Sequence, residues 1–329
     1  MRDYLGWKYG SHYEGSTIML DLEPDKHYDI PKTFFKYYAL NKNSVDALTN
    51  LYVYASHPEL LNDPFDCDMQ LAKIEDEANA KVLLERLYDQ VRSKFGIDEQ
   101  SFFQYSTDIF STIMFRKWGV LSLTDSCSNS IMWSSYANNN GFCLEWDIRQ
   151  FPFTKKGPFP IHYVEKVEEV SSKDYDVQTM VLIQSNVKLQ DWVYENEWRL
   201  MIQPPAGFDM MTFGKDADSF NQMPDLHNRK FRYPLCALKS ITLGINFFKD
   251  IVDRQQVILS DSYEYHFCYQ NNCLQTRLLN FLDRLGKISS FAPIPIIRLR
   301  VKEGLDAKVI PIEVVKINEL TYRIIETEN

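Results

Sequence analysis

One long stretch of this chain has apolar residues at helical spacing, and this feature constrains the fold most. Between residues 70 and 117, apolar residues recur at helical spacing, whereas most other ordered segments are short runs rich in β-branched and aromatic residues. Helices grouped apart from strands favour an α+β fold over alternating parallel units. We therefore expect an α+β protein with a mixed or split β-sheet core and helices packed around it.

The same patterns predict domains and the other elements. We expect an N-terminal arm at residues 1–30, a core domain at 31–250 and a C-terminal α/β extension packed on the core at 251–329. A helix at 43–50 is expected to begin with Asn43 or Ser44 as N-cap. Helices are further predicted at 130–140, 174–190, 249–259 and 273–284, and strands at 51–55, 120–124, 142–146, 159–165, 192–203, 240–244, 263–269, 294–302 and 308–316.

Composition narrows the class of protein. The 329 residues carry a net charge of −9, which argues against nonspecific binding to nucleic acid or to anionic membranes. The start of the sequence lacks the apolar stretch of a signal peptide, and no run approaches the roughly 18 apolar residues of a membrane-spanning helix. We expect a cytoplasmic protein with six reduced cysteines. The spacing of Cys268, Cys273 and His266 predicts no metal site.

The first candidate motif is the turn from Asn62 to Asp66. Asn62 and Asp63 suit a turn because their short polar side chains bond to nearby backbone amides, and Asp66 is placed to cap a following helix. Two carboxylates and one amide exceed what one turn needs, so a functional loop stays open beside a capped turn. Asn62, Asp63 and Asp66 are therefore candidate substrate-binding residues.

The second candidate motif is a strand with hydroxyl side chains, Ser122 and Thr124, followed by a helix with Trp133 and Tyr136. A spacing of three residues places both rings on one face of the helix. Such a face packs in the core or stacks on a planar ligand ring, and both interpretations stay open.

The third candidate motif is the segment from Trp192 to Leu200. As a strand, it places Glu195, Glu197 and Arg199 on one face, with the two glutamates about 7 Å apart at a rise of roughly 3.3–3.4 Å per residue. Neighbouring carboxylates differ in pKa and in role, which favours chemistry. The alternatives are a solvated strand face with a Glu–Arg ion pair, or a helix in which Glu195 and Arg199 pair four residues apart.

Taken together, these motifs resemble a widespread bacterial family of unknown function over about residues 33–246. The resemblance rests on Phe35 to Tyr37, Tyr52 to Ala55, Asn62 to Asp66, Leu121 to Thr124, Met132 to Ala137, Gly141 to Glu145 and Trp192 to Arg199. The family resemblance implies no particular reaction.

The order of the motifs also resembles that of the ADP-ribosyltransferase fold. Those proteins use an early polar or basic residue, a middle strand with Ser, Thr or Tyr, and a late Glu-x-Glu. This chain lacks a clear early Arg or His. The matching positions are Lys36 or Tyr37, Ser122 or Thr124, and Glu195-x-Glu197.

This second resemblance implies roles for the matched residues. Glu197 is the expected catalytic carboxylate, because a carboxylate stabilises the positive charge that develops when the nicotinamide–ribose bond breaks. Glu195 is expected to orient or deprotonate the acceptor. Trp133 or Tyr136 is expected to stack on nicotinamide, and Lys36 or Arg199 to meet the pyrophosphate.

The expected function is therefore an NAD-consuming enzyme, an ADP-ribosyltransferase or NAD glycohydrolase, acting as a bacterial toxin or phage-defence effector on a protein or nucleic-acid acceptor. Two alternatives stay open. One is a metal-dependent nuclease or phosphodiesterase that holds Mg²⁺ through Asp63, Asp66, Glu195 and Glu197. The other is a non-catalytic sensor or interaction module whose long loop at 205–232 binds a partner.

Overall fold

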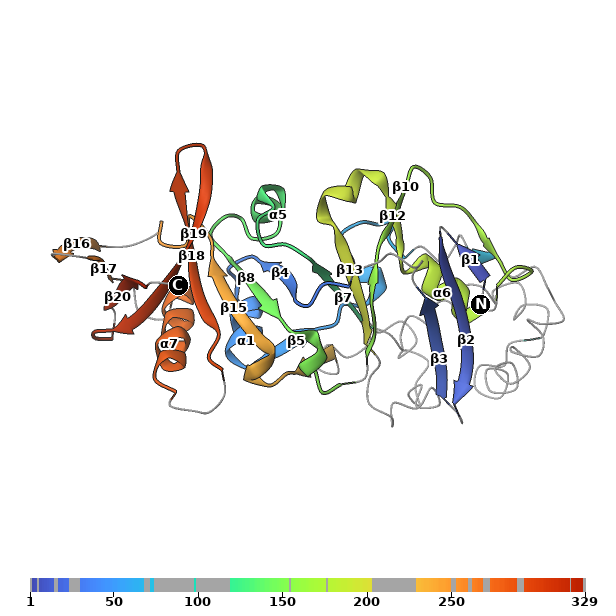
Figure 1. Cartoon of the computed structure of the whole chain (residues 1–329), viewed down its shortest axis with the longest axis horizontal. Helices are drawn as coiled ribbons and strands as arrows, with labels where there is room; N and C mark the ends of the chain where they lie inside the picture. The colour runs from blue at the N-terminus through green and yellow to red at the C-terminus, as the bar shows by residue number, and fades with distance from the viewer. Residues whose placement is uncertain are drawn as a thin grey trace. The chain divides into compact units, whose positions relative to one another are not determined.

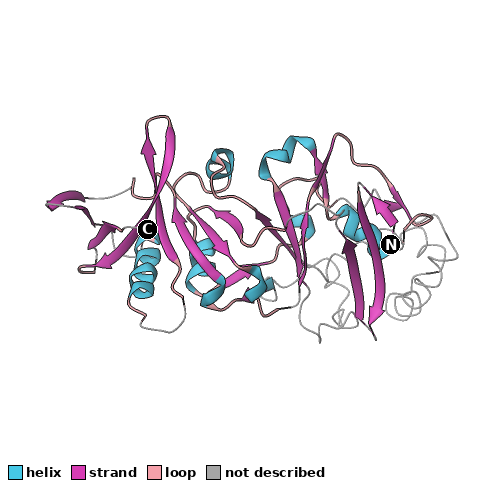
Figure 2. Cartoon of the chain, in the orientation of Figure 1, coloured by secondary structure: helices cyan, strands magenta, loops and turns pink. Residues whose placement is uncertain are grey.

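A computed structural model describes most of the chain (Figure 1). The described residues are 2–4, 6–14, 17–23, 30–67, 72–73, 98, 119–153, 155–175, 177–202, 229–249, 253–259, 262–268, 273–288, 293–319 and 321–327. Within the stretch expected to be helical, 70–117, residues 72–73 form a short strand, β6 (Ala72–Lys73), which corrects the expectation there. Nearly all the rest of that stretch and most of the loop at 205–232 lie outside the described part. Within it, strands outnumber helices and pair in both directions, which confirms the α+β class (Figure 2).

The chain forms two compact units, each made of three separate segments. Unit 1 comprises Met1–Ile30, Tyr54–Ser122 and Phe153–Lys230, and unit 2 comprises Pro31–Val53, Leu123–Pro152 and Phe231–Asn329. Three of the boundaries fall inside the strands β5 (Tyr52–Tyr54), β7 (Gly119–Thr124) and β14 (Lys230–Arg232). The expected division at residues 30 and 250 is contiguous and stays a prediction.

Unit 2 is built on a mixed sheet in which, among the described strands, only β15 and β18 pair in parallel. Its strands lie in the order β16, β17, β20, β19, β18, β15, β8 and β4, and Thr124 at the end of β7 pairs with Phe35 of β4. The bounds are β4 Phe34–Tyr38, β8 Phe142–Trp146, β15 Leu238–Leu243, β16 Asp253–Leu259, β17 Ser262–Cys268, β18 Ile296–Glu303, β19 Asp306–Lys316 and β20 Thr321–Glu326.

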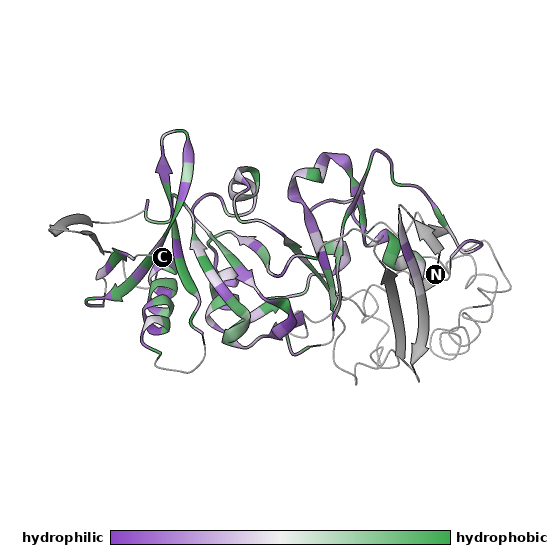
Figure 3. Ribbon diagram, in the orientation of Figure 1, coloured by the Kyte–Doolittle hydropathy of each residue, from purple (hydrophilic) through white to green (hydrophobic). Residues whose placement is uncertain are grey.

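Among the residues that the structure describes, the helices of unit 2 are short except for one. They are α1 (Lys42–Thr49), α5 (Ser130–Ser135) and α7 (Leu274–Gly286), with the 3-10 turns η3 (Ile148–Gln150) and η7 (Leu235–Ala237). Helix α7 packs against β19 and α1, and its buried leucines alternate with exposed polar residues at helical spacing (Figure 3).

The start of α1 corrects one expectation. Asn41, rather than Asn43 or Ser44, is the N-cap: its side chain accepts a hydrogen bond from the Ser44 N–H, at 3.0 Å, and its own N–H donates to Ser44 Oγ, at 3.1 Å. Ser44 is therefore the reciprocal partner three residues into the helix.

Unit 1 combines several small sheets. The first part of β7 lies next to β13 (Glu197–Ile202), which pairs antiparallel with β9 (Lys155–Pro160). Strands β1 (Arg2–Tyr4), β2 (Trp7–Glu14) and β3 (Thr17–Glu23) form an antiparallel sheet within the expected N-terminal arm. The remaining elements are β6 (Ala72–Lys73) paired with β11 (Val170–Ser171), β10 (His162–Val164) paired with β12 (Val187–Leu189), α6 (Val177–Gln184), and the turns η1 (Pro58–Leu60) and η4 (Gln190–Glu195).

The core of unit 1 draws on residues far apart in sequence. Trp7 and Tyr9 of β2 are buried together with Met180 and Ile183 of α6 and Met201 of β13. Because β12 pairs in parallel with β10 beside this core, the strand brings Lys188 opposite Tyr163. This packing positions the charged residues described below.

Three local expectations were wrong. Residues 253–259 form β16 rather than the end of a helix, because seven residues pair in register with β17 and a short apolar run does not by itself distinguish the two states. The helix expected at 174–190 ends at Gln184 and is followed by β12. Residues 190–195 form the 3-10 turn η4, so the strand expected at 192–203 begins only at Glu197.

Candidate functional site

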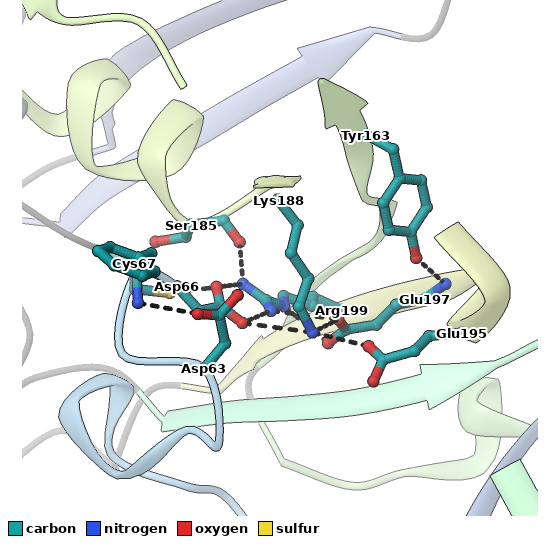
Figure 4. A network of polar contacts seen from close by, with 10 residues as sticks. Asp63, Asp66, Cys67, Tyr163, Ser185, Lys188, Glu195, Glu197 and Arg199 are labelled. Atoms are coloured by element: carbon teal, nitrogen blue, oxygen red, sulfur yellow. Dashed lines mark hydrogen bonds and ion pairs between the residues drawn. The ribbon is translucent and has the colours of Figure 1, made fainter. Parts of the chain in front are cut away.

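Five charged side chains lie together in the interior of unit 1 (Figure 4). We call them the ionic cluster. They are at most 6% exposed, although charged residues rarely are so buried unless paired. They come from the Asn62–Asp66 turn, β12, η4 and β13, and are Asp66, Lys188, Glu195, Glu197 and Arg199.

Arg199 is the centre of the cluster and is fully buried. Its two terminal nitrogens hold the two oxygens of Asp66, as a fork that matches the carboxylate. Its Nε donates to Glu197 Oε1 at 2.8 Å, and its Nη1 donates to the carbonyl oxygen of Ser185 at 2.7 Å. The guanidinium therefore joins the turn, β13 and the end of α6.

Lys188 is the second cation of the cluster. Its Nζ donates to Glu195 Oε2 at 2.7 Å and to Glu197 Oε2 at 3.3 Å, and lies 3.7 Å from Asp66 Oδ2. The ammonium also sits over the ring of Trp192, 4.5 Å from its centroid. One lysine thus contacts all three carboxylates.

The backbone between the two glutamates is bent. Glu195 ends η4, and Asn196 adopts a left-handed conformation with φ of 43°, which Asn tolerates better than most residues. Glu195 and Glu197 therefore do not lie on one strand face, contrary to the strand interpretation, but the bend and Lys188 still bring both carboxylates to one ammonium. The Glu197 N–H donates to the phenol oxygen of Tyr163 at 2.7 Å, which anchors the start of β13.

The electrostatics of the cluster keep Glu197 charged. Burial by itself raises the pKa of Glu197. The charges of Arg199 and Lys188, together with hydrogen bonds from Arg199 and Ser122, outweigh this effect and lower the pKa from 4.5 to about 2. Burial lowers the pKa of Lys188, whereas the carboxylates of Glu197, Glu195 and Asp66 raise it above its ordinary value. The solvated strand face considered as an alternative is therefore wrong for Glu197 and Arg199, which are buried.

The Asn62–Asp66 turn has two structural roles. Asp63 Oδ1 accepts a hydrogen bond from the Phe65 N–H at 2.9 Å, as expected for a turn. Asp66 binds Arg199 with both oxygens, and the residues of the helix that it was expected to cap lie outside the described part of the chain. Asn62 is exposed at the surface, whereas Asp63 is buried and its Oδ2 has no hydrogen-bond partner among the described residues.

The aromatic candidates belong to unit 2. Trp133 is fully buried, so it packs in the core, and its indole N–H donates to the carbonyl oxygen of Cys127 at 2.7 Å. Tyr37 meets its ring edge-on at 5.2 Å, and the Arg300 guanidinium lies 4.8 Å from the ring centroid. Tyr136 ends α5 as its C-cap.

The remaining candidates are placed as follows. Lys36 and Thr124 are in unit 2, and the Lys36 ammonium is 5.8 Å from the Tyr38 ring centroid. Ser122 is in unit 1, and its side chain is among the groups that lower the pKa of Glu197. Of the candidates from the sequence, the ionic cluster of unit 1 brings together Asp66, Glu195, Glu197 and Arg199.

The sequence interpretation missed Lys188 and Arg300. Lys188 stands between apolar residues in Val187-Lys188-Leu189, and a charged residue inside an apolar strand was the available signal. Arg300 lies two residues after Arg298 on β18, and this spacing gave no signal comparable to that of Lys188.

Among the described residues, no three His, Cys, Asp or Glu side chains are arranged to hold a metal ion. No helix in this part is long and apolar enough to cross a membrane.

Residues 132–200 match the model of a family described as "Protein of unknown function (DUF2971)". This confirms the resemblance to an uncharacterised family, over a segment that includes Trp133, Glu195, Glu197 and Arg199. No curated protein and no solved structure matches the chain significantly.

Proposed function

We propose that the chain is an NAD-consuming enzyme of the ADP-ribosyltransferase or NAD glycohydrolase type, with Glu197 as its catalytic carboxylate. The observation that carries the proposal is that both glutamates of the late Glu-x-Glu converge on one ammonium: Lys188 Nζ donates to Glu195 Oε2 at 2.7 Å and to Glu197 Oε2 at 3.3 Å. The Ser122 side chain of the middle strand contributes to the lowered pKa of Glu197, which connects the two motifs whose order resembles that fold. A group that stabilises the charged form of a carboxylate keeps it ionised for the reaction.

The charge balance of the ionic cluster supports this reaction. Three carboxyl groups face two cations, so the cluster has one acidic group in excess. When the nicotinamide–ribose bond breaks, its electron pair leaves with nicotinamide and positive charge develops on the ribose. An ionised carboxylate in a site of low dielectric stabilises that charge. Water or an acceptor then attacks the ribose carbon and loses its proton, for which Glu195 is the base.

On this proposal, substrate displaces one of the groups that bind Glu197. Arg199, Lys188 and Ser122 surround the carboxylate, and a carboxylate has about four acceptor directions. A ribose hydroxyl must therefore replace one donor. Lys188 is the one that gives way, because its bond to Glu197, at 3.3 Å, is longer than its bond to Glu195, at 2.7 Å. Arg199 remains to hold Glu197 in place.

The proposal includes the setting of the reaction. The enzyme acts in the cytoplasm on a protein or nucleic-acid acceptor, as a toxin or phage-defence effector. The metal-dependent alternative is less well supported, because Arg199 and Lys188 occupy the oxygens of Asp66, Glu195 and Glu197 that would bind Mg²⁺.

The test is release of nicotinamide from NAD by the purified full-length chain, measured by chromatography with and without bacterial lysate as a source of acceptor. We expect Glu197→Gln to lower the rate by about 10²–10⁴-fold, as is typical when a positioned catalytic group is lost. The control is Glu313→Gln on the exposed side of β19. Circular dichroism checks that Glu197→Gln folds.

One observation favours a second candidate, the non-catalytic sensor or interaction module. The five side chains of the ionic cluster are buried and paired with one another, which is also the arrangement of a purely structural core. If the wild-type chain neither binds NAD in calorimetry nor releases nicotinamide in lysate, the enzymatic proposal fails and this candidate remains.

A further inference from the structure

A polar cavity in unit 2 is lined by more cations than acids. It has a volume of about 600 Å³, which lies in the range of sites for small ligands. Its walls come from the end of α1, one face of α7 and the end of β19, and include Asn50, Arg277, Asn280, Asp283, Arg284 and Lys316. We call it the α1–α7 cavity.

The cations converge because of helix and strand geometry. Arg277 and Arg284 are seven residues apart on α7, which is two turns, so they lie on one face about 10.5 Å apart. Lys316 ends β19, the strand against which α7 packs, and its backbone N–H donates to Asp283 Oδ1 at 2.8 Å. Three positive groups therefore border a single cavity in a chain whose net charge is −9.

The acidic groups nearby do not neutralise this charge. Both oxygens of Asp283 bind the Lys287 ammonium, at 2.7 and 2.8 Å. Arg277 approaches Asp46 only at 3.8 Å, with 44% of its side chain exposed. Within the described residues, Arg284 and Lys316 make no ion pair, and the Arg284 Nε donates to the carbonyl oxygen of Asn280 at 3.3 Å.

We propose that the α1–α7 cavity binds a small molecule that carries a phosphate or pyrophosphate group. Arginine forks and a lysine ammonium bind phosphate through charge-assisted hydrogen bonds. The Asn50 and Asn280 side chains add neutral polar groups, and the volume suits a small molecule. None of these residues belongs to the ionic cluster, so this proposal is independent of the reaction proposed for Glu197.

The test uses the full-length chain and calorimetry with inorganic pyrophosphate. The double substitution Arg284→Gln and Lys316→Gln is expected to weaken binding by about tenfold or more, since hydrogen bonds to charged groups carry most of the affinity. The matched control is Lys32→Gln with Lys42→Gln, which removes two exposed cations of unit 2 that do not line the cavity. The control is expected to bind as the wild type does.

Three results would overturn the proposal. The first is that the wild type fails to bind pyrophosphate at any concentration up to the millimolar range. The second is that both double variants bind pyrophosphate as tightly as the wild type does. The third is that a single-stranded oligonucleotide, but not pyrophosphate, binds more weakly to the cavity variant than to the wild type, which assigns the cations to nucleic acid instead. Because Arg284 is exposed, the cavity variant is expected to fold, and an unchanged thermal midpoint without ligand confirms this.

Discussion

Replacing Arg199 by Met tests whether the ionic cluster stabilises unit 1. The side chain is fully buried and holds Asp66 with its fork and Glu197 with its Nε. Removing the cation leaves two buried carboxylates short of a partner, and breaking a buried pair in this way costs about 3–5 kcal/mol. Typical domains have only about 5–15 kcal/mol of unfolding free energy, so Arg199→Met should be among the most damaging single changes.

The chain offers a matched control for this substitution. Arg149 binds Asp147 at 2.7 Å, nearly the same length as the 2.8 Å bond of Arg199 to Glu197, but 71% of the Arg149 side chain is exposed. Solvent screens such a pair, so Arg149→Met is expected to leave the urea midpoint unchanged.

The assay is urea denaturation followed by tryptophan fluorescence and circular dichroism. It compares the wild type, the single variants Arg199→Met, Arg149→Met and Asp66→Asn, and the double variant Asp66→Asn with Arg199→Met. We expect the double variant to lose less unfolding free energy than the sum of the losses of Asp66→Asn and Arg199→Met, because each partner is costly mainly when left alone. Equal, small losses for Arg199→Met and Arg149→Met would refute the argument from burial.

Three further predictions concern other positions. The pKa of Glu197 is lowered from an ordinary 4.5 to about 2, so the unfolded state takes up the proton first as the pH falls. The stability that Glu197 contributes is therefore complete above pH 4.5 and is lost as the pH falls toward 2. This loss of stability should be missing when Glu197→Gln is unfolded at decreasing pH. Tyr163→Phe leaves the buried Glu197 N–H without its acceptor and should cost about 1–3 kcal/mol in urea unfolding, whereas a loss near zero would show that water replaces the phenol. Gly141→Ala places a methyl 1.9 Å from the Tyr38 carbonyl oxygen and should cost about 1–3 kcal/mol or more in thermal unfolding, whereas Gly286→Ala meets nothing within 4 Å and should not destabilise; equal effects would contradict the packing.

Local patterns were sufficient for elements whose sequence determines their own structure. The apolar strand β8 and the amphipathic helix α7 were predicted close to their observed bounds, and Asp63 forms the expected turn bond. These features depend on side-chain periodicity and on short-range hydrogen bonds, which the sequence carries directly.

The parts that failed depend on distant partners. β16 is a strand because β17 pairs with it. Asp66 binds Arg199, which lies more than a hundred residues later in the sequence. Lys188 joins the candidate site only because β12 pairs in parallel with β10 and brings it beside the glutamates. Spacing within the Trp192–Arg199 segment carries no information about that lysine, and the left-handed Asn196 breaks the strand that the spacing predicted.

The interleaving of the two units has a consequence for synthesis and for dissection of the gene. The chain leaves and re-enters each unit, so no single cut separates them into two intact fragments. On the ribosome, β4 emerges before its neighbours β7 and β8 and must wait with its edges unpaired until they follow. Unit 1 receives its last segment at Lys230, whereas unit 2 still needs α7 and β18 to β20. Nascent chains halted after Lys230 should therefore contain a completed unit 1 and an exposed, aggregation-prone remnant of unit 2 that engages chaperones.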